Sequence, residues 1–273
     1  MFSSMPGRLP VAKARYTETA MAILASVVMT GPVFARGGTS ASTGEFAAIT
    51  ARGRLLAEYQ TAVSDAARSA GGFHCSKQAQ VLWIARKTES GWTVVCGHNS
   101  STPGTFQIEY EASRSSNERN FVGRSYDPPI DDTGYYYFAG NAIRTALHEF
   151  RQAGRFYTAV VLPSAAEQFY VYVLPAQTSP GAFIFGADAR YAVSAGGSTV
   201  LEKHRMHRSI IEFRASDDTR KVAAGVHSHM LSDIPEDSDV AAVLTRRPSV
   251  PEFIKTRGHL FVVDVDGTIQ TKQ

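Results

Sequence analysis

The sequence predicts an α+β fold: an N-terminal helix and a disulfide-stapled β-hairpin region, followed by a mixed β-sheet flanked by helices. Three observations favour this class. Apolar residues recur at helical spacing after residue 43, two cysteines bracket a hairpin-like stretch, and short alternating strand patterns dominate after residue 154. An apolar content of 44% in 273 residues excludes a largely disordered chain and permits a sizeable core.

The first 35 residues have the pattern of a secretory signal peptide. Basic residues precede the apolar stretch 20–30, and Val33 and Ala35 occupy the third and first positions before a cut. The apolar stretch is shorter than the roughly 20 residues that span a bilayer, and no later stretch is long and apolar enough. The alternative is that this segment is not cleaved and anchors the chain in the membrane. We therefore expect a secreted or periplasmic protein with no membrane span after signal cleavage.

The mature chain divides into two predicted parts, residues 36–154 and residues 155–273. The first part begins with a helix that Ser42 or Thr43 can cap and that runs to about Ala70. Two glycines then end this helix, because glycine adopts the left-handed conformation common after a helix C-terminus.

The two cysteines, Cys75 and Cys96, stand at the ends of the predicted hairpin, whose strands 81–84 and 92–95 are joined by a turn at 89–91. In an oxidising compartment two such cysteines pair. Closing a loop of this size stabilises the fold by about 3 kcal/mol in the chain-entropy model. A redox or metal pair would have the close CxxC spacing. The expectation is therefore a structural disulfide.

Between the hairpin and residue 154, the pattern predicts a strand at 105–111 and an irregular stretch around 127–134. The aromatic run 135–138 follows a glycine and indicates a half-buried strand rather than a binding platform. A helix is expected over 139–153, ended by Gly154.

After Gly154 the pattern changes to strands and one short helix. The strands are expected at 156–162, 168–174, 183–185, 189–193, 199–201 and 222–229, the helix at 237–244, and a closing hairpin at 260–265 and 268–270. The Asp-Gly pair at 266–267 is a strong signal for the turn of that hairpin.

The residues that indicate chemistry are concentrated at 225–240. His227 and His229 are two positions apart on a predicted strand, so their imidazoles point to the same face and can converge on one metal ion. A carboxylate at the start of the next helix, Asp239 or Asp237, can supply a third ligand. Three protein ligands and an open position are typical of a catalytic zinc site, which a nearby glutamate serves as general base.

This stretch resembles the motif of the JAMM (MPN-domain) zinc metalloproteases, and especially their smaller bacterial relatives. That motif is a His-x-His pair, a loop and an aspartate at the opening of a helix. The resemblance covers only the C-terminal part, residues 155–273, which it implies to be a JAMM-like α/β domain. It implies that His227, His229 and Asp239 bind zinc. It also implies that Glu167, which leads the strand 168–174, is the catalytic general base.

Two positions differ from the family motif. Met230 stands at the family's proline position and Glu236 at its serine position, whose side chain helps to hold the oxyanion in the family. The resemblance therefore leaves two functions open. One is an exported zinc-dependent peptidase-like or isopeptidase-like hydrolase that acts on a peptide or protein substrate. The alternative is a non-catalytic exported binding or structural module on a JAMM-like scaffold.

Two further histidines, His204 and His207, lie before this stretch. On a helix they would share a face, and on a strand they would point apart. They can bind the same metal ion as His227, or they can form a basic, solvent-exposed face. We expect the solvent-exposed face. Glu202 is an alternative general base.

Other function classes lack their signals in the sequence. It contains no G-x-S-x-G nucleophile elbow, P-loop, G-x-G-x-x-G or EF-hand pattern. A formal net charge of +3, spread along the chain, does not indicate a nucleic-acid partner.

Overall fold

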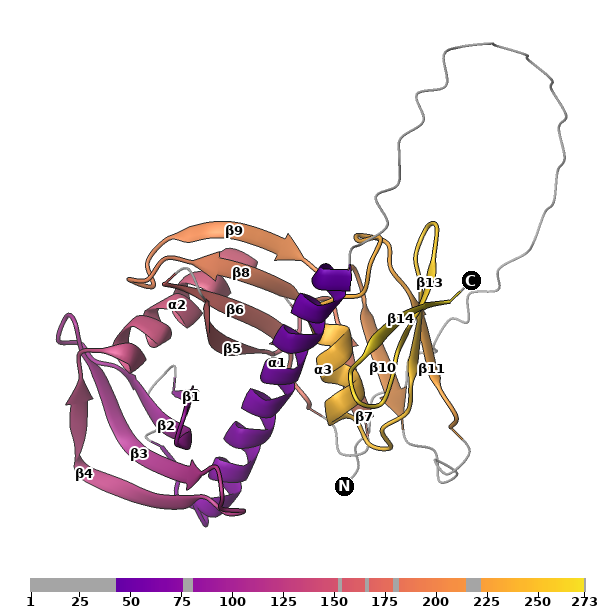
Figure 1. Ribbon diagram of the computed structural model, residues 1–273. Coiled ribbons are helices and arrows are strands. Elements are labelled where there is room, and N and C mark those ends of the chain that lie inside the picture. The colour runs from indigo at the N-terminus through magenta and orange to yellow at the C-terminus, as the bar shows by residue number, and fades with distance from the viewer. Residues whose placement is uncertain are drawn as a thin grey trace, which may run out of the picture. The chain divides into compact units, whose positions relative to one another are not determined.

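The computed structural model describes residues 43–75, 81–151, 154–164, 167–178, 182–214 and 222–272. The predicted signal peptide, residues 1–35, lies outside these residues. The described chain is α+β, as predicted, with three helices and several mainly antiparallel sheets (Figure 1). None of the helices described combines the length and the apolar character needed to cross a membrane.

The predicted N-terminal helix is confirmed as α1 (Thr43–Ser69). One of its faces is buried through Leu56, Tyr59, Ala62 and Ala66, which recur every three or four residues. Two glycines with positive φ follow the helix, and a residue with a side chain would be strained in that conformation. The helix packs along the first sheet and also against the last helix, α3 (Asp237–Thr245), so it links distant parts of the chain (Figure 1).

The first sheet is an antiparallel meander of four strands beside α1. Its strands are β1 (Leu82–Thr88), β2 (Gly91–Asn99), β3 (Phe106–Ser115) and β4 (Val122–Asp132). The Cys75–Cys96 disulfide is present and ties the segment before β1 to the buried part of β2. The expected disulfide is therefore confirmed.

Two predictions for the middle of the chain are wrong. Residues 127–132 belong to β4 rather than to an irregular stretch, because an edge strand tolerates proline, which has no N–H to pair. The aromatic run opens a helix, α2 (Tyr135–Phe150), instead of forming a strand. The carboxylate of Asp132 accepts the free N–H groups of Tyr136 at 2.9 Å and Tyr137 at 3.2 Å, which satisfies the first turn of the helix.

The C-terminal half contains three sheets rather than the single sheet predicted. One has the antiparallel order β5-β6-β8-β9, and a second is the two-stranded ribbon of β7 and β10. These strands are β5 (Tyr157–Ser164), β6 (Gln168–Pro175), β7 (Ala182–Gly186), β8 (Ala189–Val193), β9 (Val200–Arg205) and β10 (Ile210–Arg214).

The third sheet carries the His-x-His stretch. Its strands are β11 (Gly225–Ser228), β12 (Glu252–Lys255), β13 (Leu260–Val263) and β14 (Ile269–Lys272), in that order. Helix α3 connects β11 to β12, which run parallel, whereas the later pairs are antiparallel. The sheet is therefore mixed, and the strand–helix–strand unit presents the end of β11 to the first turn of α3.

A single hydrophobic cluster extends across both predicted parts of the mature chain. It contains residues of α1, the first sheet and α2, and of the β5-β6-β8-β9 sheet that follows residue 154. A smaller cluster lies between α1, α3 and the last sheet and includes Ile49, Val240 and Phe261. Both clusters hold α3 in place at the site described next.

Candidate metal centre

Four buried side chains meet in the C-terminal half: His207, His227, His229 and Asp239, with ligand atoms all within 4.8 Å of one another. The Nε2 atom of His229 lies 3.0 Å from that of His207 and 3.1 Å from that of His227. Oδ1 of Asp239 lies 3.1 Å from Nε2 of His207 and 3.2 Å from Nε2 of His227. Oδ2 of Asp239 lies 3.2 Å from Nε2 of His229. Three imidazoles and one carboxylate therefore face one point.

Three of these side chains come from the β11–α3 unit. His227 lies on the buried face of β11, and His229 continues that face because its N–H donates to the carbonyl of Lys255 at 2.8 Å. Asp239 is in the first turn of α3, where its Oδ2 also accepts the N–H of Glu236 at 2.7 Å. This capping bond holds the carboxylate toward the histidines.

The fourth side chain, His207, comes from another sheet. It follows the end of β9, and the N–H of the preceding residue, Met206, donates to the carbonyl of Asp188, directly before β8. His207 is only 5% exposed, so the expectation that it forms part of a solvated face is wrong. Its partner in the sequence pair, His204, points elsewhere and bonds to the carboxylate of Glu236 at 2.9 Å.

The other ring nitrogen, Nδ1, of each of the three histidines has an acceptor. The acceptors of His207, His227 and His229 are, in that order, Oδ1 of Asp188 at 2.8 Å, Oε1 of Glu252 at 2.8 Å and the carbonyl of Ile234 at 2.9 Å. Carboxylates and carbonyls only accept, so each Nδ1 carries the hydrogen. In the neutral imidazoles the lone pairs are then on the Nε2 atoms, which converge. Such outer partners are typical of metal-ligating histidines.

Glu252 is itself held in place by a buried cation. Its Oε2 accepts a hydrogen bond from Nη1 of Arg246 at 2.6 Å, and Nη2 of the same arginine donates to the carbonyl of Val250 at 2.7 Å. Gly225 lies against this pair, where a Cβ atom would be 2.7 Å from Nη1 of Arg246. The glycine at the start of β11 therefore leaves the space in which Glu252 orients His227.

The cluster has an excess of negative charge that a cation can balance. Asp188, Asp239 and Glu252 are buried carboxylates, and the guanidinium of Arg246 pairs with Glu252. With neutral histidines, two negative charges remain uncompensated. Oδ1 of Asp239 is buried beside Nε2 of His207 and of His227, and these atoms do not donate to it in neutral rings that carry their hydrogen on Nδ1. A buried carboxylate oxygen without a donor is costly unless a cation is bound there.

The pKa shifts reflect the same imbalance. Burial alone would lower the pKa of His207 and His227, but the neighbouring carboxylates outweigh it. The pKa of His207 is raised well above its usual range, and that of His227 is raised to about 9. Burial likewise opposes ionisation of Asp239, yet the three histidines hold its pKa well below the usual range. The site therefore favours bound positive charge, as protons or as a metal ion.

An aromatic side chain from the β7–β10 ribbon covers the cluster. The ring of Phe185 packs edge-on against His227 at 5.3 Å and against His207 at 6.0 Å between centroids, and it stacks on Phe213 at 5.8 Å. This apolar cover keeps the four ligand atoms away from solvent, which strengthens electrostatic interactions among them.

Beside the cluster, the first turn of α3 holds a second ionic network. The carboxylate of Asp237 is fully buried and accepts from Arg52 of α1 at 2.9 Å, from the hydroxyl of Tyr172 at 2.8 Å and from Arg190 of β8. Asp237 therefore faces away from the histidines, and Asp239 is the carboxylate that joins them. Asp237, the alternative third ligand, serves instead to bind α3 to three other elements.

The structure does not bring Glu167 to the cluster. This residue is exposed, with a φ of 53°, in the turn between β5 and β6. The opposite end of β6 lies near the site, where Val173 pairs with Ala189 next to Asp188. Glu167 and Val173 are six positions apart along the chain, a distance of about 20 Å at the usual rise of a strand. Glu167, which the resemblance implies to be the general base, therefore lies away from the four candidate ligands.

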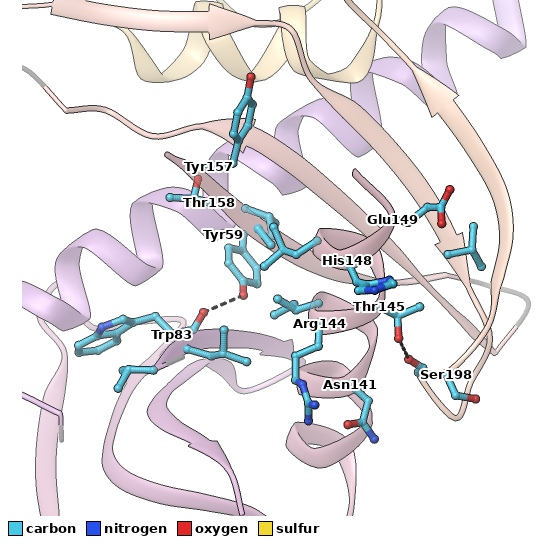
Figure 2. Close-up of a pocket in the computed structure, with 18 of the residues that line it drawn as sticks. Tyr59, Trp83, Asn141, Arg144, Thr145, His148, Glu149, Tyr157, Thr158 and Ser198 are labelled. Atoms are coloured by element: carbon cyan, nitrogen blue, oxygen red, sulfur yellow. Dashed lines mark hydrogen bonds between the residues drawn. The ribbon is translucent and has the colours of Figure 1, made fainter. Parts of the chain in front are cut away.

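Two cavities among the described residues lie apart from the four ligands. The smaller, 440 Å³, reaches the back of the site through Phe185, Asp188 and Ser238 but is not lined by any of the four. The larger, 1360 Å³, lies between α1, α2 and the edges of two sheets (Figure 2). Neither cavity gives a substrate direct access to the cluster.

No protein-family model, curated protein or solved structure significantly matches this chain. The class is therefore defined by the geometry: an α+β protein with one disulfide and a buried cluster of three histidines and an aspartate that can hold a metal ion. The resemblance to the JAMM family stays a prediction.

Proposed function

We propose that this chain is an exported zinc protein of the non-catalytic kind, a binding or structural module whose C-terminal half is organised around one zinc ion. The observation that carries the proposal is the convergence of four buried ligand atoms, each held from behind by its own hydrogen bond. Four protein ligands are typical of structural zinc sites, whereas catalytic sites keep one position open.

The donor set suits zinc. Nitrogen and oxygen ligands at about 2.0–2.1 Å in a tetrahedron lie roughly 3.3 Å from one another. The Nε2 atoms of His207 and His227 lie 3.0 and 3.1 Å from that of His229, and 3.1 and 3.2 Å from Oδ1 of Asp239, which is close to that value. All four ligand atoms lie within 4.8 Å of one another. A dication also matches the two uncompensated negative charges of the buried carboxylates.

The proposed location outside the cytoplasm rests on two features. The pattern of residues 1–35 is that of a signal peptide, and the disulfide between Cys75 and Cys96 suits an oxidising compartment. Mass spectrometry of the non-reduced exported protein tests both features. A chain that retains residues 1–35, or that has two free thiols, would contradict this location.

The zinc centre is tested by the metal content of the purified chain and by single substitutions. We expect one zinc per chain, and we expect His207→Ala to weaken zinc binding as strongly as His227→Ala. The matched control is His204→Ala, which removes a nearby histidine that bonds Glu236 and should leave the stoichiometry unchanged. A wild-type chain that stays metal-free in excess zinc at neutral pH would sink the proposal.

The hydrolase is the second candidate, and one observation favours it. The two histidines of β11 and the aspartate of α3 are arranged on a strand–helix–strand unit, as the JAMM resemblance implies. A peptidase of this type would need His207 to give up its position as a ligand, and it would need a base other than Glu167.

Cobalt(II) in place of zinc separates the two candidates. A site closed by four protein ligands should give a visible spectrum that added azide does not change, because azide binds at an open position. In a hydrolase, azide should perturb the spectrum, and His207→Ala should leave peptide hydrolysis measurable. Glu167→Gln should change neither spectrum nor activity.

A further inference from the structure

One cavity of the described chain is a groove between the edges of two sheets, which we call the edge groove. It is lined by residues 81–83 and 157–160 at those edges, by α1 and α2 at its sides, and by residues 197–200 (Figure 2). Its volume of 1360 Å³ exceeds the roughly 300–1,000 Å³ of sites for small ligands. The groove is large enough for a segment of polypeptide.

Two strands present unpaired edges to this groove. Within the described chain, β1 pairs only with β2, and β5 pairs only with β6. The opposite edges of β1 and β5 therefore have backbone N–H and C=O groups without strand partners. Such an edge can accept an additional strand from another chain.

Tyr59 of α1 shows that a group in the groove can form hydrogen bonds with the backbone of these strand edges. Its hydroxyl donates to the carbonyl of Trp83 at 3.3 Å, and it also meets the backbone of Ala85 in β1 and of Val161 in β5. One side chain thus bridges β1 and β5 at one end of the groove. Beyond Tyr59, the opening is lined by Val81, which precedes β1, by Leu82 of β1 and by residues 158–160 of β5.

The charge of the lining favours a negatively charged occupant. Arg144 of α2 is exposed and forms no ion pair with another described residue. The carboxylate that lines the groove, Glu149, is paired with Lys203 at 3.4 Å, and His148 is hydrogen-bonded to Arg151. The uncompensated charge in the groove is therefore the guanidinium of Arg144, which is suited to bind a carboxylate.

We propose that the edge groove binds an extended peptide segment of another protein. The segment adds as a strand to the free edge of β1 or β5, and a carboxylate of the segment, from an acidic side chain or a C-terminus, pairs with Arg144. Main-chain hydrogen bonds supply affinity, and the apolar lining receives alternate side chains. None of the four candidate zinc ligands lines the groove, so peptide binding there does not depend on the zinc centre.

The test begins with a display selection of short linear peptides on the full chain. The probe is a fluorescein-labelled synthetic copy of a selected peptide. Arg144→Glu should weaken its binding at least tenfold, and replacing its acidic residue by the amide should do the same. The matched control is Arg119→Glu, which makes the same charge change in the loop between β3 and β4 and should leave binding unchanged.

Two further measurements test the strand geometry. Methylation of single backbone nitrogens of the probe should weaken binding at every second position, because alternate N–H groups face the edge strand. Thr158→Trp, which fills the groove from β5, should abolish binding while zinc content and circular dichroism stay unchanged. A selection without a binder, or a binder insensitive to Arg144→Glu and to N-methylation, would overturn the proposal.

Discussion

At the scale of single residues, the histidines of the cluster should make the proposed zinc binding dependent on pH. In the metal-free chain the pKa of His227 is about 9 and that of His207 is well above its usual range, so both are protonated at neutral pH. Zinc must displace these protons. The apparent affinity for zinc should therefore rise with pH up to about pH 9. Below that pH, each displaced proton should lower the affinity about tenfold per pH unit.

Competition with a chromophoric chelator at several pH values measures this dependence. The same reasoning predicts that His204→Ala leaves the slope unchanged, because His204 pairs with Glu236 and not with the metal ligands. A zinc affinity that is flat between about pH 6 and pH 8 would mean that the cluster is already unprotonated there, contrary to the pKa shifts.

Part of this site was predictable from single residues, and part was not. The alternation of a strand put His227 and His229 on one face, and an aspartate in a first helical turn is a short-range signal. The role of His207 depends on how β9 ends beside β8, a relation between distant segments that no local pattern contains. A histidine two residues after a polar strand was the only available signal.

At the scale of elements, the contact between α1 and α3 depends on a glycine. A Cβ atom at Gly53 would lie 2.6 Å from the carbonyl oxygen of Asp237 and against the side chain of Val240. Gly53→Ala gains up to about 1 kcal/mol of helix propensity. Overpacking costs about 1–3 kcal/mol, so the steric term dominates and the variant should be less stable than the wild type.

Urea denaturation of the two chains measures the difference. Gly258→Ala is the matched control, because a Cβ atom there meets nothing within 4 Å, and its stability should stay within about 0.5 kcal/mol of the wild type. A Gly53→Ala chain as stable as this control would show that the two helices can move apart at no cost.

The elements themselves were predicted unevenly. The helix α1 and the strands β5 and β6 follow clear periodic patterns and were predicted closely. The start of α2 was missed because its signal is the carboxylate of Asp132, three residues before the helix, while the aromatic run suggested a strand. The strand β10 was not predicted, because its pairing with β7 is set by tertiary contacts rather than by alternation.

At the scale of the whole molecule, zinc should stabilise the chain as one unit. The main hydrophobic cluster includes α1, α2, two sheets and Ala241 of α3, and α1 also packs in the smaller cluster beside the metal ligands. At a free zinc concentration a thousand times the dissociation constant, the gain is about 4 kcal/mol. A chelator should therefore lower the temperature of a single unfolding transition.

Differential scanning calorimetry with and without a chelator tests this coupling. Reduction of the Cys75–Cys96 disulfide should also lower the temperature of this transition, by removing about 2–4 kcal/mol from the free energy of unfolding. This effect should be independent of the chelator's effect, because the bridge ties the first sheet and lies away from the cluster. Two separate transitions, with only one of them sensitive to the chelator, would show that the halves unfold independently.

The first turn of α3 limits how the length of the chain can change during evolution. The side chains of Glu236, Asp237 and Asp239 each bind in a different direction. Glu236 binds His204, Asp237 binds Arg52, Arg190 and Tyr172, and Asp239 contacts the three histidines of the cluster. One inserted residue would rotate the later side chains by about 100° around the helix axis. Homologous chains should therefore vary in length in the loop before residue 236 and after Thr245, and keep the spacing between these three carboxylates.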